Sequence, residues 1–144
     1  DFFVPRNVSD ECEVIHYGRN SQPLFKYFQK RWSRPAGRND QLFGYNEARV
    51  RPLIGPGYFV AHPTDADGSD VRGAVVVDYF MMPDGPVPAG WPHIKANDRG
   101  LQMFVYNKTR DYMRRISEHV SLGIAYRMEK RVMGYFVLCR EDAN

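Results

Sequence analysis

The stretch VSLGIAYRM, residues 120–128, alternates large apolar side chains with small or polar ones. Such a period of two is typical of a β-strand with one buried face. A polar turn near residues 129–131 follows, and the stretch MGYFVLC, residues 133–139, returns with strand composition. The pattern therefore predicts an antiparallel hairpin at the end of the chain.

A second hairpin is predicted upstream. Residues 58–61 and 73–82 have strand composition, and the polar loop 63–70 separates them. Residues 83–92 contain four prolines, which exclude both a helix and a central strand, so we expect a long ordered loop there. Residues 11–17 have the composition of one further short strand.

Residues 98–118 carry the clearest helical pattern in the chain. At 100° per residue, Leu101, Val105, Tyr112 and Ile116 fall within one arc, and charged residues occupy the opposite side. This spacing predicts one long amphipathic helix.

Helical spacing also appears nearer the N-terminus. Ser21 can cap a helix over residues 22–33, in which Leu24, Phe28 and Trp32 recur on one face. A shorter helical piece is expected from Asp40 to Ala48.

Together these elements predict an α+β fold. After a helical N-terminal segment the order is β-β-α-β-β, and a curved antiparallel sheet of two hairpins packs on the one long helix. We expect a single domain over residues 1–144, with residues 1–10 open to being an irregular tail.

Composition restricts the class of protein. The chain has 43% hydrophobic and 26% charged residues, a net charge of +3, and an unusually high aromatic fraction of 14%. A chain of this length can bury a core without disulfide or metal staples. No run approaches the roughly 18 apolar residues of a membrane span, and no leader pattern begins the chain, so we expect a cytoplasmic protein with no membrane span.

Basic residues cluster between 108 and 131, which raises the question of nucleic-acid binding. Asp111 and Glu118 interrupt the cluster, and no signature of a nucleic-acid-binding family is present. We therefore do not expect nucleic acid as the partner, although a basic binding face is kept as an alternative function.

A possible anion site lies along the predicted long helix. Lys108, Tyr112, Arg115 and His119 form a stripe at its apolar margin, and such a cationic stripe suits a carboxylate or phosphate on an apolar ligand. Alternatively, Lys108 and Arg115 lie along the core edge, and Asp111 pairs with Arg115 one turn away.

Asp78 stands in a strand whose other positions are apolar on both faces. A buried carboxylate is costly unless it is paired or protonated, so we expect a cationic partner within salt-bridge reach, and a role as general acid or base is the alternative. Arg127 shares the small-residue face of its own strand with Ser121, Gly123 and Ala125, which leaves room for a ligand or for the helix.

Metal and cofactor sites are not indicated. The histidines His16, His62, His93 and His119 lack metal-ligand spacing, and Cys12 and Cys139 lie far apart in the sequence. We expect no metal and no cofactor.

The function predicted from these features is small-molecule binding in an aromatic-lined pocket, with cofactor-free acid-base catalysis (isomerase, cyclase or dehydratase type) on a small organic acid or aromatic metabolite as an extension. Asp78, His119 and Tyr112 are the candidate catalytic residues. The candidate ligand-binding residues are Lys108, Arg115, Trp91, Tyr126 and Arg127.

The proline-rich loop carrying Trp91 is expected to cover the pocket or to anchor itself on the core. The alternative is a noncatalytic domain that docks a protein partner through this loop, and a homodimer is a further possibility.

Overall fold

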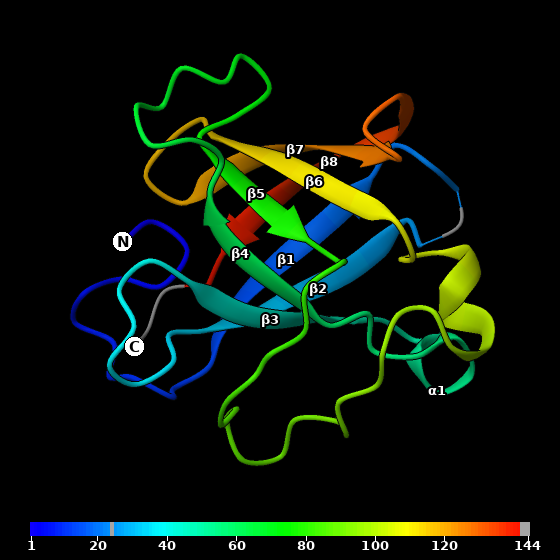
Figure 1. Ribbon diagram of the computed structural model, residues 1–144, viewed down its shortest axis with the longest axis horizontal. Coiled ribbons are helices and arrows are strands. Elements are labelled where there is room, and N and C mark those ends of the chain that lie inside the picture. The colour runs from blue at the N-terminus through cyan, green and yellow to red at the C-terminus, as the bar shows by residue number, and fades with distance from the viewer. Residues whose placement is uncertain (24, 142–144) are drawn as a thin grey trace.

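The computed structural model describes residues 1–23 and 25–141, and it shows a closed barrel of eight antiparallel strands (Figure 1). Each strand pairs with its sequence neighbours, and the first pairs with the last to close the barrel. The strands are β1 (Val14–Asn20), β2 (Tyr27–Ser33), β3 (Leu42–Glu47), β4 (Phe59–Pro63), β5 (Val75–Asp78), β6 (Thr109–Arg115), β7 (Val120–Arg127) and β8 (Arg131–Arg140).

The predicted α+β class is therefore wrong. Within the described residues the helical segments are two short pieces, α1 (Arg51–Ile54) and the 3-10 helix η1 (Gly100–Phe104). The sheet closes on itself, and its inward side chains fill the space in which a long helix was expected. None of the described helices is long and apolar enough to cross a membrane.

The long helix predicted over residues 98–118 is wrong for an identifiable reason. This segment contains η1 and then the whole of β6. In β6 the side chains of Thr109, Asp111 and Met113 are buried in the barrel. The central residue of this inward row is Asp111. Because its side chain is charged, the sequence of β6 does not show the alternation of apolar and polar residues that identifies a strand.

The helix predicted over residues 22–33 is wrong in the same way. The described residues of this segment include β2, in which Phe28, Lys30 and Trp32 share one side of the strand. Leu24, which contributed to the helical spacing, lies outside the described residues. The helical piece expected from Asp40 to Ala48 is likewise wrong, because it contains β3.

The predicted hairpins are confirmed. β4 pairs with β5, and β7 pairs with β8 with a register shift at Ala125 and Tyr126. The strand expected over residues 11–17 corresponds to β1, which begins at Val14 and ends at Asn20. The strand predicted over residues 73–82 is shorter in the structure, Val75–Asp78, and the segments assigned as helix are the ones whose type is wrong.

Three cross-strand pairs of glycine and phenylalanine shape the interior. Gly18 lies opposite Phe28, Gly44 opposite Phe59, and Gly123 opposite Phe136. A Cβ atom on any of these glycines would come within 2.6 Å of its partner's ring. Each ring therefore lies flat over a neighbouring strand, which lets large side chains fill a narrow barrel.

The segment before β1 closes one end of the barrel. Phe3 and Val4 are buried, and the Phe3 ring stacks on Trp32 at 4.4 Å between centroids. Nε2 of the buried His16 lies 2.9 Å from the Phe3 carbonyl oxygen, and Arg34 donates hydrogen bonds to the Val4 and Pro5 carbonyls. In Figure 1 this closed end is the one near the N mark, opposite α1 and η1.

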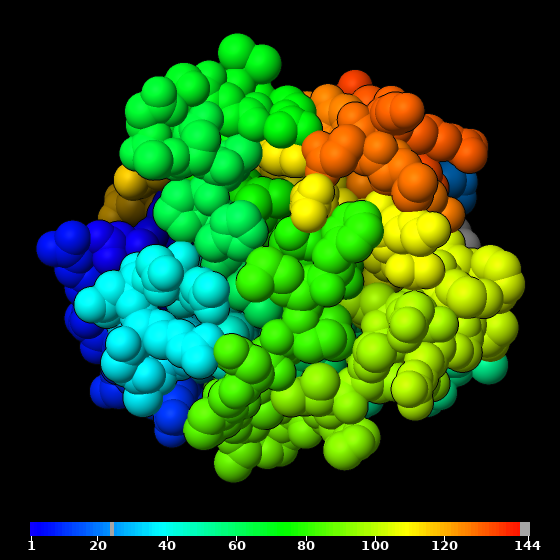
Figure 2. Space-filling model, in the orientation of Figure 1, coloured from blue at the N-terminus to red at the C-terminus, as the bar shows by residue number. Residues whose placement is uncertain are grey.

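The proline-rich loop lies against the outer wall of the barrel. The Trp91 ring packs edge-on against Tyr45 at 5.0 Å, and its Nε1 donates to Glu13. Figure 2 shows the segment that contains this loop, in green to yellow-green, spread over the front of the molecule. These contacts favour the anchor among the two possibilities left by the sequence, and the loop lines neither of the cavities described below. The role of Trp91 in ligand binding stays a prediction.

Candidate functional site

A cavity of about 190 Å³ lies inside the barrel at the end opposite the N-terminal segment. This is far more than the roughly 10–15 Å³ that one water requires by the same measure. Its walls combine aromatic rings with a small group of polar side chains, a composition typical of small-molecule sites. The lining includes Phe28, Lys30, Asn46, Tyr79, Phe104, Tyr106, Asp111, Ala125 and Phe136.

Lys30 is the centre of the polar group. Its side chain projects inward from β2 and is 1% exposed. Its Nζ donates to Asn46 Oδ1 at 3.0 Å and to the Tyr79 hydroxyl at 2.5 Å, and it forms an ion pair with Asp111 Oδ2 at 3.0 Å. Three acceptors match the three N–H donors of an ammonium group.

The neighbours of Lys30 are themselves held in place. Asn46 Nδ2 donates to the Gly57 carbonyl and to the Tyr79 hydroxyl, and the Tyr79 hydroxyl donates to Asp111 Oδ2 at 3.2 Å. The four members come from different strands: Lys30 from β2, Asn46 from β3, Asp111 from β6, and Tyr79 from the residue after β5. The group is therefore rigid and forms a polar wall for the cavity.

Aromatic rings surround the ammonium group. Its Nζ lies 4.9–5.9 Å from the ring centroids of Phe28, Phe59, Tyr79 and Phe136. Burial lowers the pKa of Lys30, and the Asp111 carboxylate opposes that shift. Burial and the same carboxylate hold the pKa of Tyr79 well above its ordinary value, so its hydroxyl stays protonated.

Two polar atoms at the cavity wall are available to a ligand. Oδ2 of Asp111 is engaged, but no described residue hydrogen-bonds to its Oδ1, and the same holds for the hydroxyl of Tyr106. The Tyr106 ring stacks on Tyr79 at 5.4 Å. It also lies against Gly57, where a Cβ atom would come within 2.4 Å of the ring, so only glycine permits this placement.

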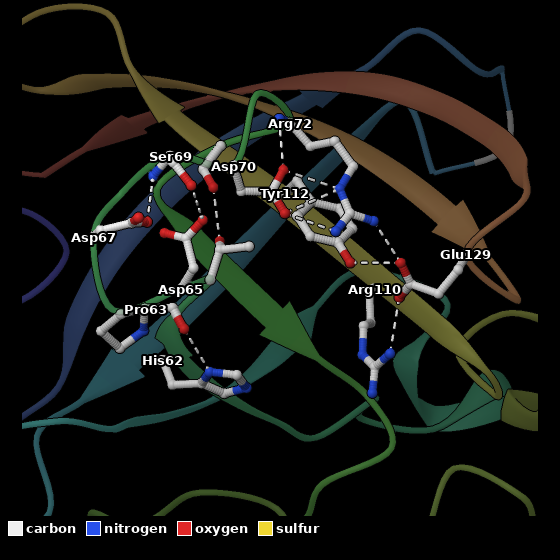
Figure 3. Close-up of polar contacts among 12 residues, drawn as sticks. His62, Pro63, Asp65, Asp67, Ser69, Asp70, Arg72, Arg110, Tyr112 and Glu129 are labelled. Carbon is white, nitrogen blue, oxygen red and sulfur yellow. Dashed lines mark hydrogen bonds and ion pairs between the residues drawn. The ribbon is translucent and has the colours of Figure 1, made fainter.

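The sequence-predicted residues lie elsewhere. Tyr112 projects from the outer face of β6, where its hydroxyl donates to Glu129 at 2.6 Å and Arg72 covers its ring at 3.8 Å (Figure 3). Tyr112 and Arg115 line neither cavity, so the expectation that they border a pocket from the interior is wrong.

Asp78 has the cationic partner that its position predicted. Its Oδ2 accepts from Arg110 Nε at 2.9 Å and lies 4.0 Å from His62. Arg110 also pairs with Glu129, which links the end of β5 to the turn after β7. The prediction of an ion pair is confirmed, and the carboxylate belongs to this outer network and lines neither cavity.

The remaining candidates are not gathered at one place. Without a helix, Lys108, Arg115 and His119 no longer form a stripe: Lys108 precedes β6, and His119 lies in the turn after it. Tyr126 packs on Tyr112 on the outer face, and Arg127 donates to the carbonyls of Phe104 and Val105 behind the cavity wall. Their roles as catalytic or ligand-binding residues stay predictions.

Sequence reasoning missed the residues that the cavity contains. Lys30, Asp111 and Asn46 lie in segments that were assigned to helices, and Tyr79 lies in the strand predicted over residues 73–82 but was not singled out. The signal that could have identified two of them is the period of two: Lys30 lies between Phe28 and Trp32, and Asp111 between Thr109 and Met113. A charged residue at such a position in a strand is a candidate for a buried pair.

A wider hollow of about 690 Å³ lies outside the closed end. Its arginines are already engaged: Arg6 pairs with Asp1, and Arg34 pairs with Asp10 and with backbone carbonyls. Nowhere in residues 1–23 and 25–141 are three His, Cys, Asp or Glu side chains placed to hold a metal ion. The cavity with the Lys30–Asp111 pair is therefore the stronger candidate.

Fold and site together define a class: an up-and-down antiparallel barrel with an aromatic cavity at one end and a buried ion pair in its wall. Comparison of the chain with protein-family models, with curated proteins and with solved structures gave no match. The functional argument therefore depends on the geometry alone.

Proposed function

We propose that the barrel binds a small, mostly apolar organic molecule in the cavity beside Lys30 and Asp111. The observation that carries this is the charged wall: an ion pair is built into the barrel interior, and it borders a space large enough for a ligand. Buried ion pairs contribute little to stability on their own, so a binding role accounts for this one better than a structural role does.

The polar atoms define what the ligand presents. Lys30 is the one cationic side chain among the described lining residues, and its three donors are already used. A carboxylate ligand would therefore have to displace Asn46, Tyr79 or Asp111. Asp111 Oδ1 accepts a polarised hydrogen and the Tyr106 hydroxyl donates to an oxygen, so a neutral hydroxyl compound fits better than an organic acid.

Docking of a protein through Trp91 finds less support, because the ring is packed on Tyr45 and bonded to Glu13. Basic-face binding to nucleic acid also finds less support, since Arg72 and Arg110 are paired with acidic side chains. A cytoplasmic location and a homodimer stay predictions.

The test uses para-ethylphenol, its methyl ether and para-ethylbenzoate as probes, with binding measured by calorimetry. The phenol should bind at least about tenfold more tightly than the ether, which lacks the hydrogen donated to Asp111, because hydrogen bonds to charged groups contribute roughly 1.5–3 kcal/mol. The benzoate should bind more weakly than the phenol.

Two variants locate the binding. Ala125→Phe fills the cavity and should abolish binding of the phenol, whereas Ala66→Phe, on the exposed loop between β4 and β5, should leave it unchanged. Equal binding by the wild type and a folded Ala125→Phe variant would refute the proposal.

A further inference from the structure

We propose that the cavity also catalyses proton transfer at the carbon next to a carbonyl group, with Asp111 as the base and Tyr106 as the donor to the carbonyl oxygen. This inference rests on the proposed function, because it requires a small organic molecule in the same cavity. An enolisable ketone presents what a hydroxyl compound presents: an oxygen acceptor and, close to it, a hydrogen that a carboxylate can accept.

Asp111 has the placement that a general base needs. Its Oδ2 is held at 3.0 Å by Lys30 and at 3.2 Å by Tyr79, which fixes the carboxylate plane. Every contact of this carboxylate with a described residue goes to Oδ2, so Oδ1 has no hydrogen-bond partner among them, and Asp111 lines the cavity. Lys30 and Tyr79 act through Asp111, so they are positioning residues.

Tyr106 supplies the second group. Its ring is fixed between Tyr79 and Gly57, and its hydroxyl has no partner in the described part of the chain. Burial and the charge of Asp111 raise the pKa of this hydroxyl, so it remains a donor at neutral pH. A donor aimed at a carbonyl oxygen stabilises the negative charge that develops there during enolisation.

The proposed proton transfer balances, with solvent water as the source of the new hydrogen where isotope exchange is followed. The α-carbon gives its proton to Asp111 Oδ1, the electrons of the C–H bond form a carbon–carbon double bond, and the carbonyl π electrons move to the oxygen. Tyr106 donates a hydrogen bond to that enolate oxygen. Asp111 then delivers the proton to the γ-carbon of an unsaturated ketone, which gives isomerisation. When the proton on Asp111 is first replaced by a deuteron from D₂O, its return to the α-carbon gives isotope exchange.

The surroundings favour this step. Negative charge moves from Asp111 to the substrate oxygen, while the Lys30 ammonium group stays 3.0 Å from Asp111 Oδ2. Phe28 and Phe136 wall the space, and in such surroundings fixed dipoles act more strongly than in water. No redox change or bound cofactor takes part.

The first experiment measures exchange. Cyclohexanone is incubated with the wild-type chain in D₂O, and loss of its α-proton NMR signal is followed against buffer alone. The rate should rise with protein concentration, and Asp111→Asn should lower the protein-dependent rate by about 10²-fold or more. The matched control is Asp67→Asn on the exposed loop, which should leave the rate unchanged.

Tyr106→Phe keeps the variant test decisive if Asp111→Asn fails to fold, because it removes a hydroxyl without a described partner. It should lower the exchange rate at least about tenfold while cyclohexanone still binds. An unchanged rate in this variant would overturn the assignment of Tyr106. The β,γ-unsaturated cyclohexenone should in addition be converted to its conjugated isomer, which is visible in the ultraviolet spectrum.

The outcomes separate the two proposals. If cyclohexanone binds to the wild type but exchanges no faster than in buffer, the catalytic inference is overturned and the binding function stands. If neither cyclohexanone nor para-ethylphenol binds, both are overturned.

Discussion

The two ends of the barrel are built from the same strands and differ in what they enclose. At the closed end, Phe3, Trp32 and Met113 pack into an apolar cluster sealed by the N-terminal segment. At the open end, Lys30 and Asp111 face a cavity. The apolar cluster and the charged wall are only two residues apart on each strand: Trp32 lies at the closed end and Lys30 faces the cavity on β2, and Met113 and Asp111 do the same on β6.

The difference indicates that the two ends have different roles. The closed end buries aromatic surface, and His16 and Arg34 make polar contacts with backbone carbonyls of the N-terminal segment, so this end contributes stability. The open end keeps two charges out of water, which is costly, and leaves space unfilled. A barrel selected for stability alone would fill both ends in the same way.

The largest effect is expected at the open end. Lys30→Met leaves the Asp111 carboxylate buried without its cation and should lower the free energy of unfolding by about 4 kcal/mol. The double variant Lys30→Met with Asp111→Leu should recover much of the loss, because no charge then remains buried. Denaturant unfolding measures both. A loss below about 1 kcal/mol in the single variant would mean that the pair is not desolvated.

Phe3→Ala tests whether the N-terminal segment is part of the core. Removing the ring that stacks on Trp32 should cost about 3 kcal/mol and leave para-ethylphenol binding unchanged. Phe104, which is 67% exposed, supplies the control: Phe104→Ala should change stability by less than about 0.5 kcal/mol. A loss of binding in Phe3→Ala would show that the two ends are coupled.

Acid should weaken the closed end through His16. Burial lowers the pKa of this imidazole from its ordinary value of 6.5 to about 4, with a smaller contribution from Arg140. Because the unfolded chain binds the proton more readily, stability is highest above pH 6.5 and falls as the pH drops toward 4. Between pH 7 and pH 5 the loss from His16 should be about 2 kcal/mol.

The matched variant for this pH effect is His16→Gln, which has no group titrating in that range. Its unfolding free energy should depend less on pH between 7 and 5 than that of the wild type. Parallel curves for the two proteins would assign the acid sensitivity to other groups.

The smallest effect is expected for the outer wall. Trp91→Ala removes packing on Tyr45 and the hydrogen bond to Glu13, and it should cost about 1–2 kcal/mol of stability with no change in para-ethylphenol binding. Thermal unfolding measures the loss of stability, and calorimetry measures the binding of para-ethylphenol. Weaker binding at unchanged stability would restore the view of this loop as a cover over the ligand.

The sequence was sufficient to predict the secondary structure of segments with a clear local pattern. The alternation in residues 120–128 and the turn after it specified β7 and β8, and the prolines of residues 83–92 excluded regular structure. These signals are local, so they survive without knowledge of the fold.

The sequence was insufficient for β2 and β6 because each strand carries one member of the buried ion pair. Lys30 and Asp111 interrupt the apolar alternation of their strands, and aromatic residues nearby imitate a helical spacing. Neither charge could be assigned to the interior before its partner was known to lie opposite, and that pairing is a property of barrel closure. Lys30 and Asp111 are therefore both the reason that β2 and β6 were assigned as helices and the central residues of the candidate site.

Closure of the barrel through β1 and β8 has a consequence for how the protein is made. β1 gains β2 as a neighbour early, but its other edge meets β8, with Tyr17 opposite Cys139, only when the last strand has been synthesised. Pairing over such a sequence distance is slow, and unpaired strand edges are templates for another chain. Arrest of translation after β7 would therefore leave a sheet with two open edges, prone to aggregate on the ribosome in a way that the finished barrel is not.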